Sequence, residues 1–437
     1  MKRWRSLDVA FRHGLKFLTA LSAPLALALA SLLAASVLSA CGGGAKAETP
    51  TVSARSDGAA ELPATARGAL LQSAWSAYPR LVRLAHQTDP ARNGRIVASV
   101  VENAAGTWRA GFHSSDDGGA SFSRLGVLTD PHFATGLCCG TLFEMPQAVG
   151  ALPAGTLLYA ASVGADVAGT PMTQPIYRSD DGGATFARLP GAACGSTDVP
   201  RTPGGLGSGL WEPEFLVAAD GSLACVFSDE TVPGRSQVLQ LVRTTDGVQW
   251  SAPAIVVAGA QASDRPGMAS VRRLPDGRYA MSFEVCSTAR LDCAAHLKLS
   301  DDGLHWGAPD DFGSRPQTAA GQYFRHAPTL AWAATPGRPA GRLVMIGQIV
   351  GTGSTGVDAA DNGRAMLVAT EAGGGGAWRL LGAPIGLAQP PAQTNWCQNY
   401  STPILPSVDG TEVLLMQTDR AADDGCNARF GKGPLAG

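Results

Sequence analysis

The stretch Ser179-Asp180-Asp181-Gly182-Gly183-Ala184-Thr185-Phe186 decides the fold of this chain, because it recurs along the sequence. A nearly identical copy runs from Ser115 to Phe122, and two copies one residue shorter run from Thr244 to Trp250 and from Ser300 to Trp306. A degraded fifth copy spans residues 370–378. Successive copies start 56 to 70 residues apart, which is the size of a supersecondary unit. The sequence therefore predicts an array of similar units.

A second pattern lies between these boxes and consists of a proline, an apolar strand, a Gly turn and another apolar strand. The prolines that open the six units are Pro79, Pro146, Pro213, Pro266, Pro328 and Pro403. The turns within the units are Asn93-Gly94, Ala154-Gly155, Asp220-Gly221, Asp276-Gly277, Ala340-Gly341 and Asp409-Gly410. Such turns between short apolar runs indicate hairpins, and a proline is tolerated at a strand start.

A third strand runs into each box and a fourth follows it, so that every unit supplies four antiparallel strands. Six units of this kind predict an all-β fold, a six-bladed β-propeller with four-stranded blades over residues 62–437. Because a ring must close, we expect the first and last strands of this region to share a blade. With 54 Gly and 29 Pro, the chain is interrupted too often for long helices.

The box itself is best interpreted as a turn. Its Ser and Asp side chains can accept hydrogen bonds from nearby backbone N–H groups, and its glycines supply positive φ angles. The final aromatic residue is then free to enter the apolar layer of the blade. Calcium binding by the aspartates is the alternative, but the box lacks the later bidentate Glu of an EF-hand loop.

The box pattern Ser-x-Asp-x-Gly-x-Thr-Phe/Trp resembles the Asp-box, or bacterial neuraminidase repeat, of sialidase-like propellers. The third and fourth units are most similar to the exo-arabinanases of glycoside hydrolase family 93. The segments that carry this similarity are Leu210-Trp211-Glu212-Pro213, Phe227-Ser228-Asp229-Glu230, Arg265-Pro266-Gly267-Met268 and Leu274-Pro275-Asp276-Gly277-Arg278-Tyr279, running into Phe283-Glu284. The resemblance covers roughly residues 70 to 430 and implies an exo-acting glycoside hydrolase.

The starts of the first strands and the ends of the second strands converge on one mouth of a propeller channel. A retaining glycosidase needs two carboxyl groups about 5–5.5 Å apart at such a place. The family resemblance implies Glu212 as acid/base and Glu284 as nucleophile. Glu214 lies on the same strand face as Glu212 and is the alternative acid/base; we favour Glu212. The expected substrate-binding residues are Tyr78, Trp211, Glu214, Glu230, Arg265, Arg325, His326 and Tyr400.

Two other functions remain open. A sialidase would need an arginine triad, for which Arg80, Arg83, Arg265 and Arg325 are available, but Tyr78-Pro79-Arg80 departs from the opening motif of that family. The chain could instead be a propeller that binds glycans or proteins without catalysis. For hydrolysis we expect no cofactor and no metal, an oligo- or polysaccharide substrate and a monomer. A formal net charge of −2 gives no reason to expect nucleic acid as a partner.

The N-terminus is typical of an export signal. A basic region is followed by an apolar run and then by Leu38-Ser39-Ala40-Cys41, which resembles the lipobox of bacterial lipoproteins. We expect a signal peptide over residues 1–40, a lipidated Cys41 and a flexible tether over residues 41–61. The mature protein would then be held at a membrane, on the periplasmic or cell-surface side, through its lipid anchor alone.

Export also changes the expected state of the cysteines. Eight remain after Cys41, and an even number in an exported chain favours disulfides. Cys286 with Cys293 and Cys397 with Cys426 are the expected pairs, and Cys138 or Cys139 with Cys194 is a third possibility. Cys225 lies in an apolar strand and is interpreted as a buried free thiol. The cysteine spacings do not indicate zinc.

Overall fold

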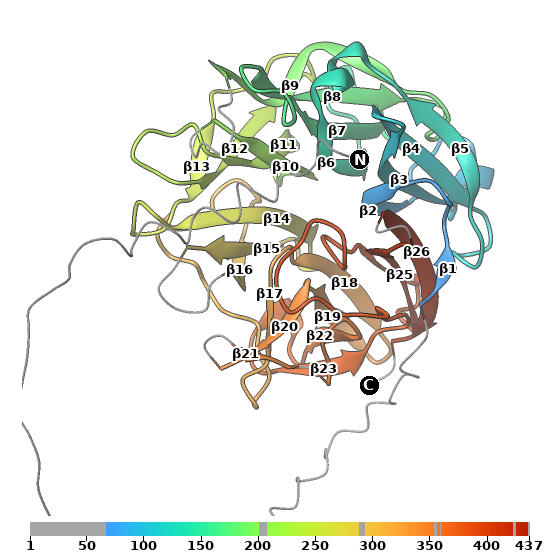
Figure 1. The fold of residues 1–437 in the computed structure, drawn as a ribbon, viewed down its shortest axis with the longest axis vertical. Coiled ribbons are helices and arrows are strands. Elements are labelled where there is room, and N and C mark those ends of the chain that lie inside the picture. The colour runs from blue at the N-terminus through green and yellow to red at the C-terminus, as the bar shows by residue number, and fades with distance from the viewer. Residues whose placement is uncertain are drawn as a thin grey trace, which may run out of the picture.

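The computed structural model describes residues 67–200, 208–287, 293–353, 356–358, 360–422 and 425–435. Within them the chain forms six β-sheets arranged as blades around a central channel (Figure 1). This confirms the all-β, six-bladed propeller. The expected signal peptide, Cys41 and the tether lie outside the described residues. No helix in the described part of the chain has the length and apolarity needed to cross a membrane.

The first three blades have four consecutive strands each. Their strands are β2 (Ser76–Arg83), β3 (Ile96–Ala104), β4 (Thr107–Ser115) and β5 (Ser123–Leu128); β6 (Leu137–Glu144), β7 (Leu157–Val163), β8 (Pro171–Ser179) and β9 (Ala187–Pro200); and β10 (Leu210–Val217), β11 (Leu223–Asp229), β12 (Val238–Thr244) and β13 (Ala254–Val257). The described 3₁₀ helices are η2 (Pro90–Arg92), η3 (Pro131–Thr135) and η4 (Ala372–Gly374).

The last three blades are less regular. The fourth contains β14 (Arg265–Arg273), β15 (Tyr279–Cys286), β16 (Ala294–Ser300), β17 (Tyr323–Arg325), β20 (Ile349–Thr352) and β21 (Gly356–Val357). The fifth contains β18 (Thr329–Thr335), β19 (Arg338–Ile346), β22 (Ala365–Ala369) and β23 (Trp378–Gly382). The sixth contains β24 (Ile404–Pro406), β25 (Glu412–Arg420), β26 (Cys426–Pro434) and β1 (Ala69–Leu70).

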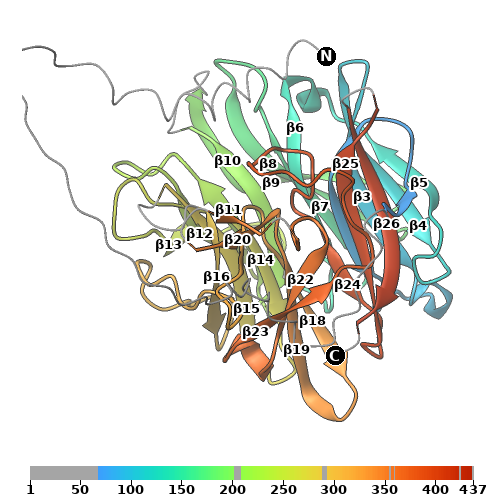
Figure 2. The same ribbon diagram turned by 60° about the horizontal axis from the view of Figure 1, so that its bottom comes forward.

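The ring closes in the way that the sequence predicts. The N-terminal strand β1 pairs antiparallel with β26, with Ala69 opposite Phe430 and Leu70 opposite Arg429. Figures 1 and 2 show β25 and β26 next to the first blade, and both strands contact β2. The sixth blade therefore holds strands from both ends of the described chain.

Strands in the interior of the blades are apolar along their length because each blade is covered by its neighbours on both faces. All seven residues of β7, with the sequence LLYAASV, are buried. The same holds for β11, with the sequence LACVFSD. The core consists mainly of apolar clusters between adjacent blades, and one of them extends to Tyr78 and Met268 at the centre of the ring.

The recurring box forms a turn between the third and fourth strands. In the second blade, the Gly183 N–H donates to the Ser179 hydroxyl at 2.9 Å, and the Thr185 N–H donates to Asp181 at 3.0 Å. Each box contacts the preceding blade: Phe186 stacks on Phe112 of the first blade at 4.2 Å between ring centroids, and the Arg92 guanidinium donates to the Asp181 carbonyl. The box is scaffold that aligns the blades.

Two strand boundaries differ from the sequence prediction. In the second unit, Met145-Pro146 was expected to open the first strand, but β6 ends before it at Glu144 and that segment lies in the following connection. In the fifth unit, Ala340-Gly341 was expected to be the hairpin turn, but it lies within β19, and the turn falls at residues 336–337. The second unit has no proline in its first strand, so the next proline along the chain was taken instead, and in the fifth unit a later glycine was taken for that of the turn.

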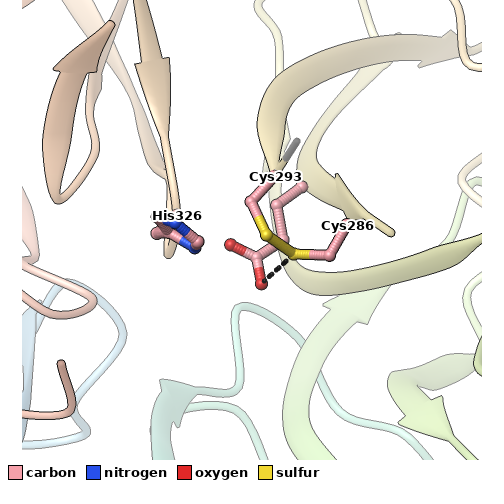
Figure 3. A group of neighbouring side chains, drawn as sticks. Cys286, Cys293 and His326 are labelled. Atoms are coloured by element: carbon pink, nitrogen blue, oxygen red, sulfur yellow. Dashed lines mark hydrogen bonds between the residues drawn. A yellow bond between two sulfur atoms is a disulfide. The ribbon is translucent and has the colours of Figure 1, made fainter. Parts of the chain in front are cut away.

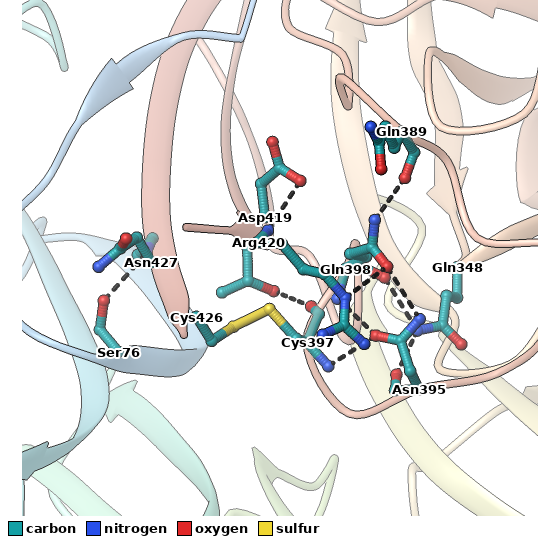
Figure 4. The surroundings of a disulfide bond; sticks show 12 residues. Ser76, Gln348, Gln389, Asn395, Cys397, Gln398, Asp419, Arg420, Cys426 and Asn427 are labelled. Atoms are coloured by element: carbon teal, nitrogen blue, oxygen red, sulfur yellow. Dashed lines mark hydrogen bonds between the residues drawn. A yellow bond between two sulfur atoms is a disulfide. The ribbon is translucent and has the colours of Figure 1, made fainter. Parts of the chain in front are cut away.

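The eight cysteines form four disulfides. The expected pairs Cys286–Cys293 and Cys397–Cys426 are confirmed. Figure 4 shows the second of them beside Gln398 and Asn395 of the segment that leads into the sixth blade. The prediction for the other four cysteines was wrong. Cys138 bonds to its neighbour Cys139, and Cys194 bonds to Cys225, which is therefore not a free thiol. Cys225 pairs because β9 of the preceding blade lies against β11.

Candidate active site

The first strand of each blade carries an irregularity at the same place. In the first four blades it is a β-bulge, where the register shifts between Ala77 and Arg80, Cys138 and Thr141, Trp211 and Glu214, and Gly267 and Ser270. The bulged residues with positive φ are Tyr78, Cys139, Glu212 and Met268, and Ala327 and Ser401 take the same conformation in the last two blades. Non-glycine residues in this region are strained, and such strain clusters at functional sites.

Four of these six residues, each from a different blade, are directed to the channel. Tyr78, Glu212, Met268 and Ser401 all line one pocket at the centre of the ring. Tyr78 and Glu212, two of the residues that precede unit-opening prolines, both line that pocket. Arg265 also precedes a proline but begins β14, and Met268 takes the bulged position in that blade.

The Glu212 carboxyl group has a raised pKa. Its side chain is partly buried, and Oε2 accepts a hydrogen bond of 2.6 Å from the Ser228 hydroxyl. Burial raises the pKa of Glu212 to about 7, and this outweighs the lowering effect of hydrogen bonds from Ser228 and the Met268 backbone. The neighbouring charges of Glu230 and Arg265 act in opposite directions on the same pKa. Such a group can both donate and accept a proton at neutral pH.

Glu284 stands at the end of β15, on the blade next to that of Glu212. Its Oε2 accepts a hydrogen bond of 2.6 Å from the backbone N–H of Ala327, the bulged residue of the fifth blade. Its Oε1 lies 3.5 Å from the sulfur of Cys286. A backbone N–H aimed at a carboxylate stabilises its negative charge. Both glutamates thus accept a hydrogen bond from the backbone of the following blade, Glu212 from Met268 and Glu284 from Ala327.

Tyr400 and Tyr78 connect the two carboxylates. Burial raises the pKa of Tyr400 well above its usual value, and the charges of Glu284, Glu212 and Tyr78 raise it further. The Tyr78 and Tyr400 rings lie 6.0 Å apart between centroids, and both hydroxyl groups approach the Met268 sulfur, at 3.5 and 3.9 Å. These interactions bring Tyr78, Tyr400, Glu212 and Glu284 to one site.

Glu230 and Arg265 form an ion pair beside Glu212. The guanidinium of Arg265 binds Glu230 and also donates to the side chains of Ser236, at 2.8 Å, and Gln237, at 2.9 Å. Glu230 in turn accepts a hydrogen bond of 3.0 Å from the N–H of Gly209, which lies three residues before Glu212 in the sequence. Both residues lie at the site as expected, but Arg265 is engaged by Glu230 and positions the region around Glu212.

Glu214 has a structural role. Its Oε1 accepts from the Arg272 guanidinium at 2.7 Å and from the Val271 N–H at 3.1 Å, and its Oε2 accepts from the Thr141 hydroxyl at 3.3 Å. The residue lines the pocket but its carboxylate is fully occupied by these three partners. This arrangement supports Glu212, the residue favoured from the sequence, as the proton donor.

Arg325, His326 and Trp211 complete the expected set. Arg325 ends β17 and pairs with Ala294 and Ile349, while His326 follows it at positive φ and is buried. Burial and the charge of Arg325 lower the pKa of His326 to about 3, so its imidazole is neutral. Trp211 packs against the apolar clusters on both sides of its blade.

Sequence reasoning missed several residues of the pocket, Arg272 and Thr329 among them. Met268, Ser401 and Ser270 line it, although none belongs to a residue type that signals chemistry. Met268 stood inside the quoted Arg265-Pro266-Gly267-Met268 segment, and Ser401 follows Tyr400 directly. Met268 and Ser401 occupy the position in their repeat units that Glu212 occupies in the third unit. An alignment of the units at this position would have predicted both residues.

One cluster in the described part of the chain has the composition of a metal site. Glu284, Cys286, Cys293 and His326 place their ligand atoms within 4.8 Å of one another. Figure 3 shows His326 facing the Cys286–Cys293 bond. Because the two sulfurs are bonded to each other, they are not available as thiolate ligands in this state.

Comparison with known proteins gives a consistent picture of the fold. No family model matches the chain, and no curated protein matches it. Among solved structures, the α-L-arabinanase of Penicillium chrysogenum complexed with arabinobiose is similar, with a TM-score of 0.65 and 19% identity over 84% of this chain and 96% of that one. The chain shares the six-bladed propeller fold of these enzymes.

Two further structures are of the Fusarium graminearum α-L-arabinofuranosidase. One is a complex with an iminosugar inhibitor, with a TM-score of 0.63 and 19% identity over 85% of this chain and 95% of that one. The other, described as a family 93 glycoside hydrolase with arabinobiose, also has a TM-score of 0.63 and 19% identity, over 84% of this chain and 97% of that one. The similarity extends over nearly the whole length of each relative.

Proposed function

We propose that the chain is a retaining, exo-acting glycoside hydrolase that cleaves arabinan-like polysaccharide. The observation that carries this proposal is a pair of glutamates on adjacent blades, Glu212 and Glu284, whose charges both act on the buried Tyr400. Glu212 is partly buried with its pKa raised to about 7, and Glu284 accepts a hydrogen bond from a backbone amide. A carboxyl group whose pKa lies near 7 suits the acid/base role, which leaves the role of nucleophile to Glu284.

In this mechanism Glu212 protonates the leaving oxygen of the glycosidic bond while Glu284 attacks the anomeric carbon. A covalent glycosyl–enzyme ester forms at Glu284, and the released alcohol takes the proton of Glu212. Glu212, now a carboxylate, removes a proton from water, and that water displaces Glu284 from the sugar. Ser228 holds the Glu212 carboxyl in place, and Ala327 holds that of Glu284.

The choice of sugar rests on similarity. The relatives of comparable fold were solved with arabinobiose, and the segments around Glu212, Glu230, Arg265 and Glu284 resemble the same family. The half-buried Trp211 and the Tyr78–Tyr400 pair offer aromatic surfaces beside the carboxylates. We further propose that the chain is exported and that the lipobox-like Cys41 anchors the enzyme near its polysaccharide. We also assign the repeated turns, such as Ser179 to Phe186, to the Asp-box of sialidase-like propellers.

The sialidase alternative is disfavoured by the arginines. That chemistry requires three arginines directed at one substrate carboxylate. Here Arg265 is paired with Glu230, the Arg83 guanidinium donates to the Pro406 carbonyl, and Arg80 donates to the carbonyls of Pro79 and Ser401. Three of the four candidate arginines are therefore committed to the protein itself.

Incubation of the purified protein with linear arabinan and with sialyl-lactose tests the proposal. We expect short arabino-oligosaccharides from the first and no product from the second, and proton NMR should show that the anomeric configuration is retained. Glu284→Gln should abolish turnover while the circular dichroism spectrum stays unchanged. Absence of product from every glycan, with the fold intact, would leave a non-catalytic binding propeller.

A further inference from the structure

Glu284 has unusual neighbours for a catalytic carboxylate. The disulfide Cys286–Cys293 joins the end of β15 to the residue before β16, and its Cys286 sulfur lies 3.5 Å from Glu284 Oε1. His326 directly follows β17 of the same blade, and its backbone N–H donates to the Cys293 carbonyl at 2.9 Å. Two sulfurs, one imidazole and one carboxylate thus meet at one point, with ligand atoms no more than 4.8 Å apart.

This set is the usual ligand set of zinc. Zinc is bound tetrahedrally by thiolate, imidazole and carboxylate at about 2.0–2.3 Å, which places the ligand atoms roughly 3.3–3.8 Å from one another. Movements of about one ångström bring the present atoms to that spacing. His326 is buried, and a neutral imidazole is the form that binds metal. Cys293 and His326 are buried, while Cys286 and Glu284 are partly exposed, so a metal ion could enter from the channel side.

We propose that reduction of the Cys286–Cys293 disulfide creates a zinc site from Cys286, Cys293, His326 and Glu284. A dithiol or phosphine reductant supplies two electrons, the sulfur–sulfur bond breaks, and two thiols form. Zinc then replaces the two thiol protons and takes Glu284 as a further ligand. The sequence spacing of the cysteines gives no sign of this site, because His326 lies far beyond Cys293 along the chain, after β17.

The consequence for activity rests on the proposed function. If Glu284 is the nucleophile, zinc bound to its carboxylate removes the lone pairs that attack the sugar, so the reduced, metal-loaded protein is inactive. The oxidised protein has no thiolates at this position and is insensitive to the same metal. The disulfide would then protect the nucleophile from metals in an oxidising environment.

Metal binding can be measured without reference to activity. The full chain is reduced with a phosphine, desalted anaerobically and titrated with Co²⁺, whose thiolate complexes absorb strongly in the near ultraviolet, and then with Zn²⁺. We expect one equivalent of metal in the reduced wild type and none at this site in the oxidised protein. The matched control is Cys286→Ser/Cys293→Ser, which retains the other six described cysteines and should lose this equivalent. His326→Ala should weaken binding at least tenfold.

Circular dichroism of each reduced sample checks that the propeller remains folded. Equal metal binding by the reduced wild type and the double variant would place the metal on other cysteines and overturn the proposal, as would equal binding by the oxidised protein. An activity assay on arabinan then separates the two claims. One equivalent of bound metal in a chain with no hydrolase activity would support the metal site and reject the proposed function. An active hydrolase that binds no metal after reduction would support the proposed function and reject the metal site.

Discussion

Glu212 and Glu214 are two residues apart on one strand, yet their surroundings give them different roles. Glu214 accepts hydrogen bonds from Arg272, Val271 and Thr141, whereas Glu212 has one side-chain donor, Ser228, among its described partners. The proline between them lies in the bulge, which changes the orientation of the strand at this point. Sequence alternation alone places both residues on the same face, so only the bulge separates them.

The raised pKa of Glu212 predicts the pH dependence of hydrolysis. A general acid must be protonated in the free enzyme, and the protonated fraction of Glu212 falls as the pH rises through about 7. We expect kcat/KM for arabinan to decline above about pH 7. Glu212→Gln should remove this alkaline limb and lower kcat by roughly 10²–10⁴-fold. The loss should be much smaller for an aryl arabinoside whose phenolate leaves without protonation.

Glu214→Gln is the control for that prediction. It weakens the contacts to Arg272 and Val271 and should destabilise the fold, by up to about 3 kcal/mol as expected for one broken buried ion pair. The alkaline limb near pH 7 should persist in this variant, because Glu212 is intact. An alkaline limb that survives in Glu212→Gln would show that another group supplies the proton.

The sequence allows a site residue to be predicted where a charged side chain stands within a segment that resembles a known family. Glu212, Glu230, Arg265 and Glu284 carry charge and stand in segments that resemble a known family, and the structure places all four in adjacent blades at one end of the channel. Met268 escapes such reasoning because a thioether is typical of a core. Its contact with two tyrosine hydroxyls depends on a backbone φ of 61°, which no side-chain pattern reveals.

At the scale of the strand, the recurring bulge is the device that builds the site. Each blade has a residue with positive φ within or just before its first strand, and three of these residues precede a proline, namely Tyr78, Glu212 and Ala327. Four of the six residues line the central pocket. In the second blade the same place is taken by Cys139, which is bonded to Cys138. No proline follows there, which is why the sequence pattern placed this strand too late.

The strain in the bulge can be measured at Ser401. Its φ is 56°, and its side chain is small, so substitution changes little besides the backbone preference. Ser401→Gly relieves the left-handed conformation, and we expect a change in the free energy of unfolding within about 1 kcal/mol of wild type, of either sign. Ser401→Val places a β-branched side chain at positive φ and should destabilise by about 2 kcal/mol or more.

Urea denaturation of the two Ser401 variants gives this comparison directly. The glycine variant is the matched control, because it also removes the hydroxyl that lies near Tyr78. A valine variant as stable as the glycine variant would mean that the bulge relaxes in solution and that the positive φ is not enforced by the fold.

For the whole molecule, the sequence repeats predict the six-bladed architecture, but they do not predict the features in which individual blades differ. The box and the hairpin turns recur, so six blades and their closure follow from counting. The fourth blade departs from the count because β17 pairs with β20, which lies within the connection between β19 and β22 of the next blade. Likewise, Cys194 finds Cys225 across a blade boundary. Contacts between units depend on how neighbours stack, and no single unit encodes them.

Closure of the ring by β1 predicts the effect of truncation. Leu71, directly after β1, is buried among Ile96, Val100 and Phe430, and Arg67 pairs with Asp419. Removal of residues 1–71 deletes these contacts together with the pairing of β1 to β26. Burial of a leucine side chain contributes about 1.5–3 kcal/mol. We therefore expect this truncation to lower the free energy of unfolding by about that amount and to shift the denaturant midpoint to lower concentration.

The control is removal of residues 1–61, which deletes the expected signal peptide, Cys41 and the tether but leaves the whole predicted propeller. Its midpoint should equal that of the chain without the signal peptide, because the closing strand remains. Leu71→Ala in the longer chain should reproduce most of the loss, since the leucine supplies the buried area and β1 itself is exposed. Equal midpoints for the two truncations would show that the ring is held closed by the three strands β24, β25 and β26 without the N-terminal segment.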